Sequence, residues 1–294
     1  MVKQEKRVSA TRTAESQFAV MADRYFGLSQ QGTDVRTEFI AGLTTFLTMV
    51  YIVFVNPIIL GKAGMDQGAV FVATCVAAAV STLVMAFYAN YPIALAPGMG
   101  INAFFAFTVV LTYKYSWQQA LAAVFCSGVL FLLISIFRIR QYVIDAIPQN
   151  LKLAVSAGVG LFLGIIALEE AKVVVAHPAT LVTLGDLTDP QAILMLLGFV
   201  LIAGLNYRRI LGGTLIGILV VTLIGLPSGL AKFTGIISMP PSIAPTFLQL
   251  DFSRVSELTF LIVVFSILFV DVFDNAGTLI GVTHRTGLMK NGKL

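Results

Sequence analysis

Long apolar runs separated by short polar stretches make up most of this sequence. A helix needs roughly 20 apolar residues to cross a bilayer, and several runs approach or exceed that length. The pattern therefore predicts a series of membrane-spanning helices. The eight candidate spans are residues 38–60, 68–89, 98–113, 117–137, 152–168, 190–205, 210–226 and 257–283.

The composition agrees with this pattern, because 57% of the residues are hydrophobic and only 12% are charged. Soluble domains carry about 25% charged residues, so the sequence predicts an all-α polytopic membrane protein. Cys75 and Cys126 lie in apolar runs and are expected to act as small buried hydrophobic residues. The basic residues fall in short loops rather than in patches interleaved with aromatic residues, so nucleic-acid binding is not indicated.

The distribution of basic residues predicts the orientation of the chain. With a cytoplasmic N-terminus and alternating spans, fourteen of the nineteen Lys and Arg residues fall on the cytoplasmic side, as the positive-inside rule requires. Residues 1–37 then form a cytoplasmic tail and residues 284–294 a cytoplasmic loop. Residues 38–226 carry the first seven spans, and residues 227–256 form an external connection with an interfacial segment before the eighth span at 257–283. We expect a multi-pass protein of the plasma membrane, of the bacterial inner-membrane type.

Helix breakers interrupt the third span. Pro92 and Pro97 lie in the irregular segment 90–97 that leads into it, and Gly98, Gly100 and Asn102 follow at its start. A proline keeps the backbone before it extended, and it suits the first turn of a helix, where its missing N–H costs nothing. The sequence therefore predicts a short extended segment and then a half-helix that starts near Gly98, with Pro97 in its first turn. Transporters use the positive ends of such half-helices to hold substrate near the membrane midplane.

Two other interpretations of this stretch compete with ligand binding. Residues 98–103 fit the G-x-G-x-x-A pattern of dinucleotide-binding domains, but no βαβ unit surrounds them and the next acidic residue is Asp145. A proline kink packed against a neighbour by small residues is the purely structural interpretation. The residues alone leave ligand binding and a structural kink equally open.

Two acidic residues stand near the middle of the eighth span. Asp271 and Asp274 have no other charge close to them in the sequence. A carboxylate at the bilayer centre costs about 2.5–3.5 kcal/mol, so both residues need compensating surroundings. Their i,i+3 spacing places them on one helical face, which Asn275 and Thr278 extend. Because desolvation favours the neutral form of a carboxyl, each acid is a candidate to carry a proton or to accept an N–H from a ligand. An internal cap or a hydrogen bond between helices is the alternative, above all for Asp271.

Other residues give weaker signals. Thr45 in the first span could line a cavity, although such a hydroxyl more often bonds to its own helix. Gly213 and Gly217 form a GxxxG pair, which is typical of close helix packing, and spaced glycines in the fifth span suggest the same. Neither histidine has a Cys, His or acid at metal-ligand spacing, and no nucleotide-binding loop or hydrolase elbow is found. No metal, cofactor or enzymatic activity is therefore predicted.

Three stretches together resemble the nucleobase–cation symporter-2 family and, within it, the adenine/guanine/hypoxanthine permease branch. They read "EFIAGLTTFLTMVYIVFVNP", "ALAPGMGINAFFAF" and "LFVDVFDNAGTLIGV". The resemblance implies fourteen helices in two inverted repeats of seven, with the third and tenth helices each interrupted by a short strand and purine bound between them. This chain would then hold the first repeat and the first helix of the second, and would be truncated before the last six helices.

The resemblance also implies roles for particular residues. Asp274 resembles the eighth-helix acid that binds the base and couples transport to protons, and Asp271 is the second candidate for proton coupling. Asn102 resembles the polar residue of the third helix near the site, and residues 96–100 resemble the junction of strand and half-helix. The expected partners are a purine nucleobase, protons, membrane lipid and a second copy in a homodimer. The expected substrate-binding residues are Thr45, Ala96, Gly98, Met99, Gly100, Asn102, Asp274 and Thr278.

The residues alone also allow other functions. A uracil or xanthine carrier of a sister branch is hardly excluded. An anion carrier of the same fold would need a neutral or cationic group in place of Asp274. A membrane-embedded enzyme would need a nucleophile or a set of metal ligands at membrane depth, and the two acids alone do not provide one. A chain without the last six helices could also be a non-transporting membrane half-protein.

Overall fold

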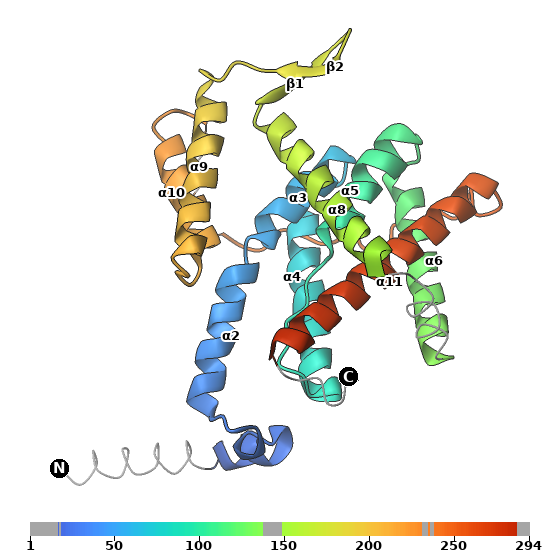
Figure 1. Ribbon diagram of the computed structural model, residues 1–294. Coiled ribbons are helices and arrows are strands. Elements are labelled where there is room, and N and C mark those ends of the chain that lie inside the picture. The colour runs from blue at the N-terminus through green and yellow to red at the C-terminus, as the bar shows by residue number, and fades with distance from the viewer. Residues whose placement is uncertain (1–16, 18, 138–148, 231–234, 236–237, 287–294) are drawn as a thin grey trace.

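The computed structural model is mostly helical, and its helices coincide with the eight predicted apolar runs (Figure 1). By length and composition, five helices among the fully described residues could cross a membrane, and Met99–Thr112 and Gly213–Gly225 are shorter apolar helices. The predicted all-α polytopic class is therefore confirmed. The structure describes residues 17, 19–137, 149–230, 235 and 238–286, with only the backbone of residues 149–153, 155, 156, 159 and 276–286.

The elements follow one another along the chain with short connections. The first span consists of α2 and α3, the second of α4 and the π-helical turn η2, and the third of the extended residues 90–98 followed by α5 and the π-helical η3. The bounds are η1 (Ser29–Gln31), α2 (Val35–Met49), α3 (Ile52–Lys62), α4 (Gln67–Val84), η2 (Met85–Ala89), α5 (Met99–Ala103), η3 (Phe104–Thr112), α6 (Trp117–Ile136), α8 (Gln149–Glu170), β1 (Val174–His177), β2 (Leu181–Leu184), α9 (Pro190–Tyr207), α10 (Gly213–Gly225) and α11 (Leu258–Thr286).

Side-chain caps explain where several helices begin. The side chain of Asp66 accepts a hydrogen bond from the backbone N–H of Ala69 at the start of α4. Ser116 and Gln119 form a reciprocal capping box at the start of α6. Asp189 caps α9, whose first residue is a proline. Each cap satisfies a backbone N–H that has no partner within the helix, so these starts are encoded locally.

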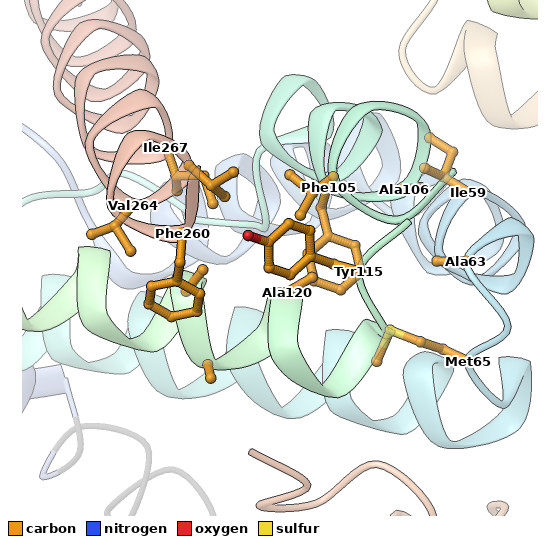
Figure 2. Packing of buried hydrophobic residues seen from close by; sticks show 14 of the residues in the cluster. Ile59, Ala63, Met65, Phe105, Ala106, Tyr115, Ala120, Phe260, Val264 and Ile267 are labelled. Carbon is orange, nitrogen blue, oxygen red and sulfur yellow. The ribbon is translucent and has the colours of Figure 1, made fainter. Parts of the chain in front are cut away.

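A buried cluster joins α11 to the helices of the first four spans. It contains residues of α3, α4, η3, α6 and α11, and Figure 2 shows Phe260, Val264 and Ile267 of α11 beside Tyr115 and Ala120. Phe260 is only 1% exposed. Between helices in a bilayer, van der Waals packing of apolar side chains is a main favourable term, so this cluster fixes α11 relative to the interrupted third span.

The connection that leads into α11 is attached to the start of α6. Residues 238–257, the described part next to α11, form turns and irregular backbone rather than a helix. The hydroxyl of Tyr115 donates a hydrogen bond to Glu257 at 3.1 Å, and the guanidinium of Arg254 lies over the Tyr115 ring. Burial raises the pKa of Tyr115, and the hydrogen bond to Glu257 and the charge of that carboxylate raise it further. Gln119 also donates to Ser253 at 3.1 Å, so this connection holds the start of α11 in place.

A β-hairpin between α8 and α9 is not among the predicted elements. β1 pairs antiparallel with β2, with Val174 opposite Leu184 and His177 opposite Leu181. At its base, Lys172 forms an ion pair with Asp189 at 3.6 Å. β-branched residues favour strands, but two four-residue runs beside long apolar spans are too short to stand out in a hydropathy pattern.

Glycines bring α9 and α10 together, as the GxxxG pair predicts, and the two helices lie side by side next to α2 (Figure 1). A Cβ atom at Gly213 would lie 2.9 Å from Cβ of Leu205, and one at Gly217 would collide with Ile202. For the glycines of the fifth span, the prediction of close helix packing is wrong as far as the described residues go. There, a Cβ atom at Gly158, Gly160 or Gly164 would meet nothing within 4 Å.

Replacing Gly217 by alanine should therefore destabilise the protein by about 1–3 kcal/mol, the usual cost of overpacking. The matched control is Gly204→Ala on the facing helix α9, where the new methyl group would meet nothing within 4 Å. That variant should be neutral or slightly stabilising, because alanine favours helix over glycine by about 0.8–1.0 kcal/mol. Thermal unfolding in detergent measures both changes, and equal melting temperatures for the two variants would contradict the packing.

Candidate functional site

The third span is interrupted by an extended segment, residues 90–98, which contains no helix. Asn90 ends η2 in the left-handed conformation, and Gly98 is the extended N-cap of α5. The predicted interruption is confirmed, and the half-helix begins at Met99. Pro97 lies before the N-cap rather than in the first turn, so that detail of the prediction is wrong. The restriction that a proline places on the residue before it keeps this end of the segment extended.

A threonine of the second span holds the extended segment. The hydroxyl of Thr82 accepts a hydrogen bond from the backbone N–H of Leu95 at 3.0 Å and donates to the carbonyl of the same residue at 3.2 Å. One side chain thus satisfies both backbone groups of Leu95, as a neighbouring strand would. Nothing in the sequence distinguishes Thr82 from the neighbouring hydroxyl residue Ser81, because both lie in an apolar run.

The structure brings Asp274 to the start of the half-helix. A Cβ atom built at Gly98 would lie 2.9 Å from Oδ2 of Asp274, so the carboxylate occupies space that a side chain at position 98 would need. The side chain of Asp274 is exposed, and no residue in the described part of the chain donates a hydrogen bond to it. An accessible carboxylate therefore stands beside the positive end of an interrupted helix.

The other acid of α11 is engaged within its own helix. The side-chain amide of Asn275 donates to Oδ1 of Asp271 at 2.8 Å and to the backbone carbonyl of the same residue at 2.9 Å. This geometry is the local hydrogen bond that the sequence left open for Asp271. Thr278 lies on the same helix, but its side chain is outside the described residues.

Asn102 is joined to two buried polar residues that the sequence did not single out. Its side-chain amide donates to Oδ1 of Asn56 at 2.6 Å, and the amide of Asn56 donates to the hydroxyl of Thr74 at 2.7 Å. The hydroxyl of Thr74 donates in turn to the backbone carbonyl of Val70 at 2.7 Å. Asn56 lies beside Pro57 in α3, and a lone asparagine in an apolar span was the available signal.

A hollow of about 610 Å³ lies between α2, α3, α4 and the extended segment. Thr45 and Ala96 line it, as do Thr82 and Tyr91. The hydroxyl of Thr45 donates to the backbone carbonyl of Ala41 at 3.0 Å, so it bonds to its own helix.

The remaining predicted residues follow one another along the half-helix. Met99 and Gly100 form the first turn of α5, after Gly98 and before Asn102. The backbone N–H of Asn102 donates to the carbonyl of Gly98 at 3.2 Å, so these two residues lie one turn apart on the same side of the helix. The structure thus places Asn102 one turn after the N-cap glycine, beside which Oδ2 of Asp274 lies.

These features define a polytopic membrane protein in which an interrupted helix faces an acidic residue of another span, an arrangement found in secondary transporters. The chain matches the family model described as the Permease family over residues 36–293, and it belongs to that family. The predicted resemblance to the purine branch of the nucleobase–cation symporters is confirmed, and the family consists of transporters rather than enzymes.

Several curated relatives are purine permeases. The chain is 47% identical to the adenine permease AdeP of Escherichia coli, over 96% of this chain and 63% of the relative. It is 46% identical to the adenine permease AdeQ of the same organism, over 92% of this chain and 61% of the relative. It is 44% identical to the guanine/hypoxanthine permease PbuG of Bacillus subtilis, over 92% of this chain and 64% of the relative. The chain thus spans a little under two thirds of the length of these relatives.

Proposed function

We propose that the protein containing this chain carries a purine nucleobase, adenine, guanine or hypoxanthine, together with protons across the plasma membrane. The observation that carries the proposal is the exposed carboxylate of Asp274 beside Gly98, at the start of the half-helix. The relatives support a purine substrate, since they are named as adenine or guanine/hypoxanthine permeases. The distribution of Lys and Arg supports a cytoplasmic N-terminus.

The proposed site binds a flat heterocycle by its polar edges. A purine presents both N–H donors and acceptor atoms around its rings. Asp274 accepts an N–H of the base, and the free backbone N–H groups of Met99 and Gly100 at the start of the half-helix donate to an acceptor. Asn102 contacts a further polar group of the base. Ala96, Thr45 and Thr278 complete the proposed lining.

Proton coupling follows from the cost of charge within a membrane. An ionised carboxylate at the bilayer centre costs about 2.5–3.5 kcal/mol, and binding a proton removes that charge. Asp274 therefore moves with a proton or with a base that compensates its charge, which links the two gradients. Asp271 is the second candidate proton carrier, although its hydrogen bond from Asn275 ties it more closely to its own helix.

Two competing substrates are disfavoured by separate observations. An anion would be repelled by Asp274, the acid that lies beside the half-helix. A pyrimidine such as uracil could be bound by the same groups, but the relatives at 44–47% identity are named for purines.

The experiment that tests the proposal is uptake of labelled adenine, guanine, hypoxanthine and uracil. The complete reading frame is expressed in cells that lack their own nucleobase permeases. We expect saturable uptake of at least one purine, competition by unlabelled purines, and little uptake of uracil. A protonophore should collapse the accumulation, because the proton gradient drives it. Uptake of uracil alone, or purine accumulation that resists the protonophore, would contradict the proposal.

A further inference from the structure

Three side chains connect the proposed site to the interior of the first four spans. The sequence of hydrogen bonds runs from Asn102 to Asn56, from Asn56 to Thr74 and from Thr74 to the backbone carbonyl of Val70. Asn56 is only 4% exposed and Thr74 only 2%. Water therefore has little access to these groups, and each hydrogen bond is costly to leave unmade.

The chemistry of the last acceptor sets the direction of every bond. The Val70 carbonyl can only accept, so the single hydroxyl proton of Thr74 is used there. Towards Asn56 the Thr74 oxygen can then only accept, which turns the NH₂ group of Asn56 to Thr74 and its carbonyl oxygen to Asn102. Asn102 must in turn present its NH₂ group to Asn56.

The result is that the carbonyl oxygen of Asn102 is the end of its amide that is left for a ligand. No described residue donates a hydrogen bond to that oxygen, and Asn102 is only partly buried. An amide without such constraints offers either a donor or an acceptor by rotating half a turn. Here the buried neighbours remove that freedom.

We propose that Asn56 and Thr74 are positioning residues for base selection: they fix the side-chain amide of Asn102 with its oxygen towards the ligand. This inference rests on the proposed function. Together with Asp274, it gives the site two side-chain acceptors, so the preferred ligand is a base that presents two N–H donors. The three purines of the proposed function all have two or more N–H groups in their neutral forms.

The test is a double-mutant cycle on the half-saturation constant for uptake. Thr74→Val keeps the shape of the side chain but removes the hydroxyl that fixes Asn56. For at least one purine we expect the half-saturation constant to rise about 2- to 12-fold, the range for one neutral hydrogen bond. The maximal rate per transporter in the membrane should change less. Thr74→Ser retains the hydroxyl and should behave like the unmodified protein.

The deciding comparison uses Asn102→Ala as the background. Because Thr74 is proposed to act through Asn102, adding Thr74→Val to Asn102→Ala should raise the half-saturation constant no further. An effect of Thr74→Val that persists undiminished in that background would overturn the inference and assign Thr74 a general structural role. Absence of purine uptake by the unmodified protein would instead refute the proposed function, so the two failures are distinguishable.

Discussion

Replacing Asp274 by asparagine should abolish proton-driven purine accumulation while leaving the protein folded in the membrane. The structure records no hydrogen bond from a described residue to this carboxylate, so the substitution breaks no such internal bond. Asparagine has nearly the same shape but carries no charge and cannot exchange a proton. Loss of a hydrogen bond to a charged group costs about 1.5–3 kcal/mol, or about 10- to 140-fold in affinity. The loss of proton coupling adds to this effect.

The measurements separate recognition from coupling. Uptake in cells reports both, whereas exchange of labelled for unlabelled adenine across proteoliposomes needs no proton gradient and reports recognition and movement alone. The matched control is Asp271→Asn, three residues earlier on the same helix. Its oxygen can still accept the hydrogen bond from Asn275, so we expect a decrease of about 2- to 12-fold at most. Normal uptake by Asp274→Asn, or complete loss only in Asp271→Asn, would reverse the assignment of the two acids.

The helices and the interrupted span could be predicted because their signals are local. Apolar runs of sufficient length define the spans, and capping residues such as Asp66 and Ser116 mark the helix starts. Pro92 and Pro97 break the third span, and their effect reaches only the neighbouring residues. Each of these features depends on a few consecutive residues, so it can be recognised before any tertiary contact is known.

The polar network could not be predicted, because its members meet only in the folded chain. Asn56 bonds to a residue 18 positions away and to another 46 positions away. Thr82 reaches the backbone of Leu95 across 13 positions. In the sequence Asn56 is a single polar residue within an apolar run, and Thr82 is one of two adjacent hydroxyl residues in another such run. Such residues often bond to their own helix, as Thr45 does, and the pattern gives no means of telling the two cases apart.

Spacing alone also failed to separate residues with identical patterns. Asp271 and Asp274 share one helical face, yet Asp271 accepts a hydrogen bond from Asn275 of its own helix, whereas the carboxylate of Asp274 lies beside Gly98 at the start of the half-helix. Gly217 packs against Ile202, whereas Gly164 in an equally glycine-rich span faces open space. In both cases the contacts with a neighbouring helix decide the role of the residue, and the sequence of one helix does not show which helix packs against it.

Replacing Gly98 by alanine should impair purine uptake almost as strongly as the loss of Asp274, although it adds only one methyl group. The new Cβ atom would lie 2.9 Å from Oδ2 of Asp274, well inside van der Waals contact. The backbone of Gly98, with φ −73° and ψ 116°, is one that alanine adopts without strain. The carboxylate can rotate away at little cost to stability. The carboxylate is then displaced from the place where the base binds, so we expect the half-saturation constant to rise about 10- to 140-fold, as for a lost charged hydrogen bond.

Two comparisons make this prediction specific. Gly128→Ala in α6 introduces the same methyl group where nothing lies within 4 Å, and it should leave uptake unchanged. Gly98→Ala combined with Asp274→Asn should be no more impaired in adenine exchange than the more impaired of the two single variants, because both substitutions act on one carboxylate. If Gly98→Ala transported purines normally at an unchanged membrane level, Asp274 and the start of the half-helix would not form a common site. The methyl group is thus a probe of the contact itself, independent of the charge that Asp274→Asn removes.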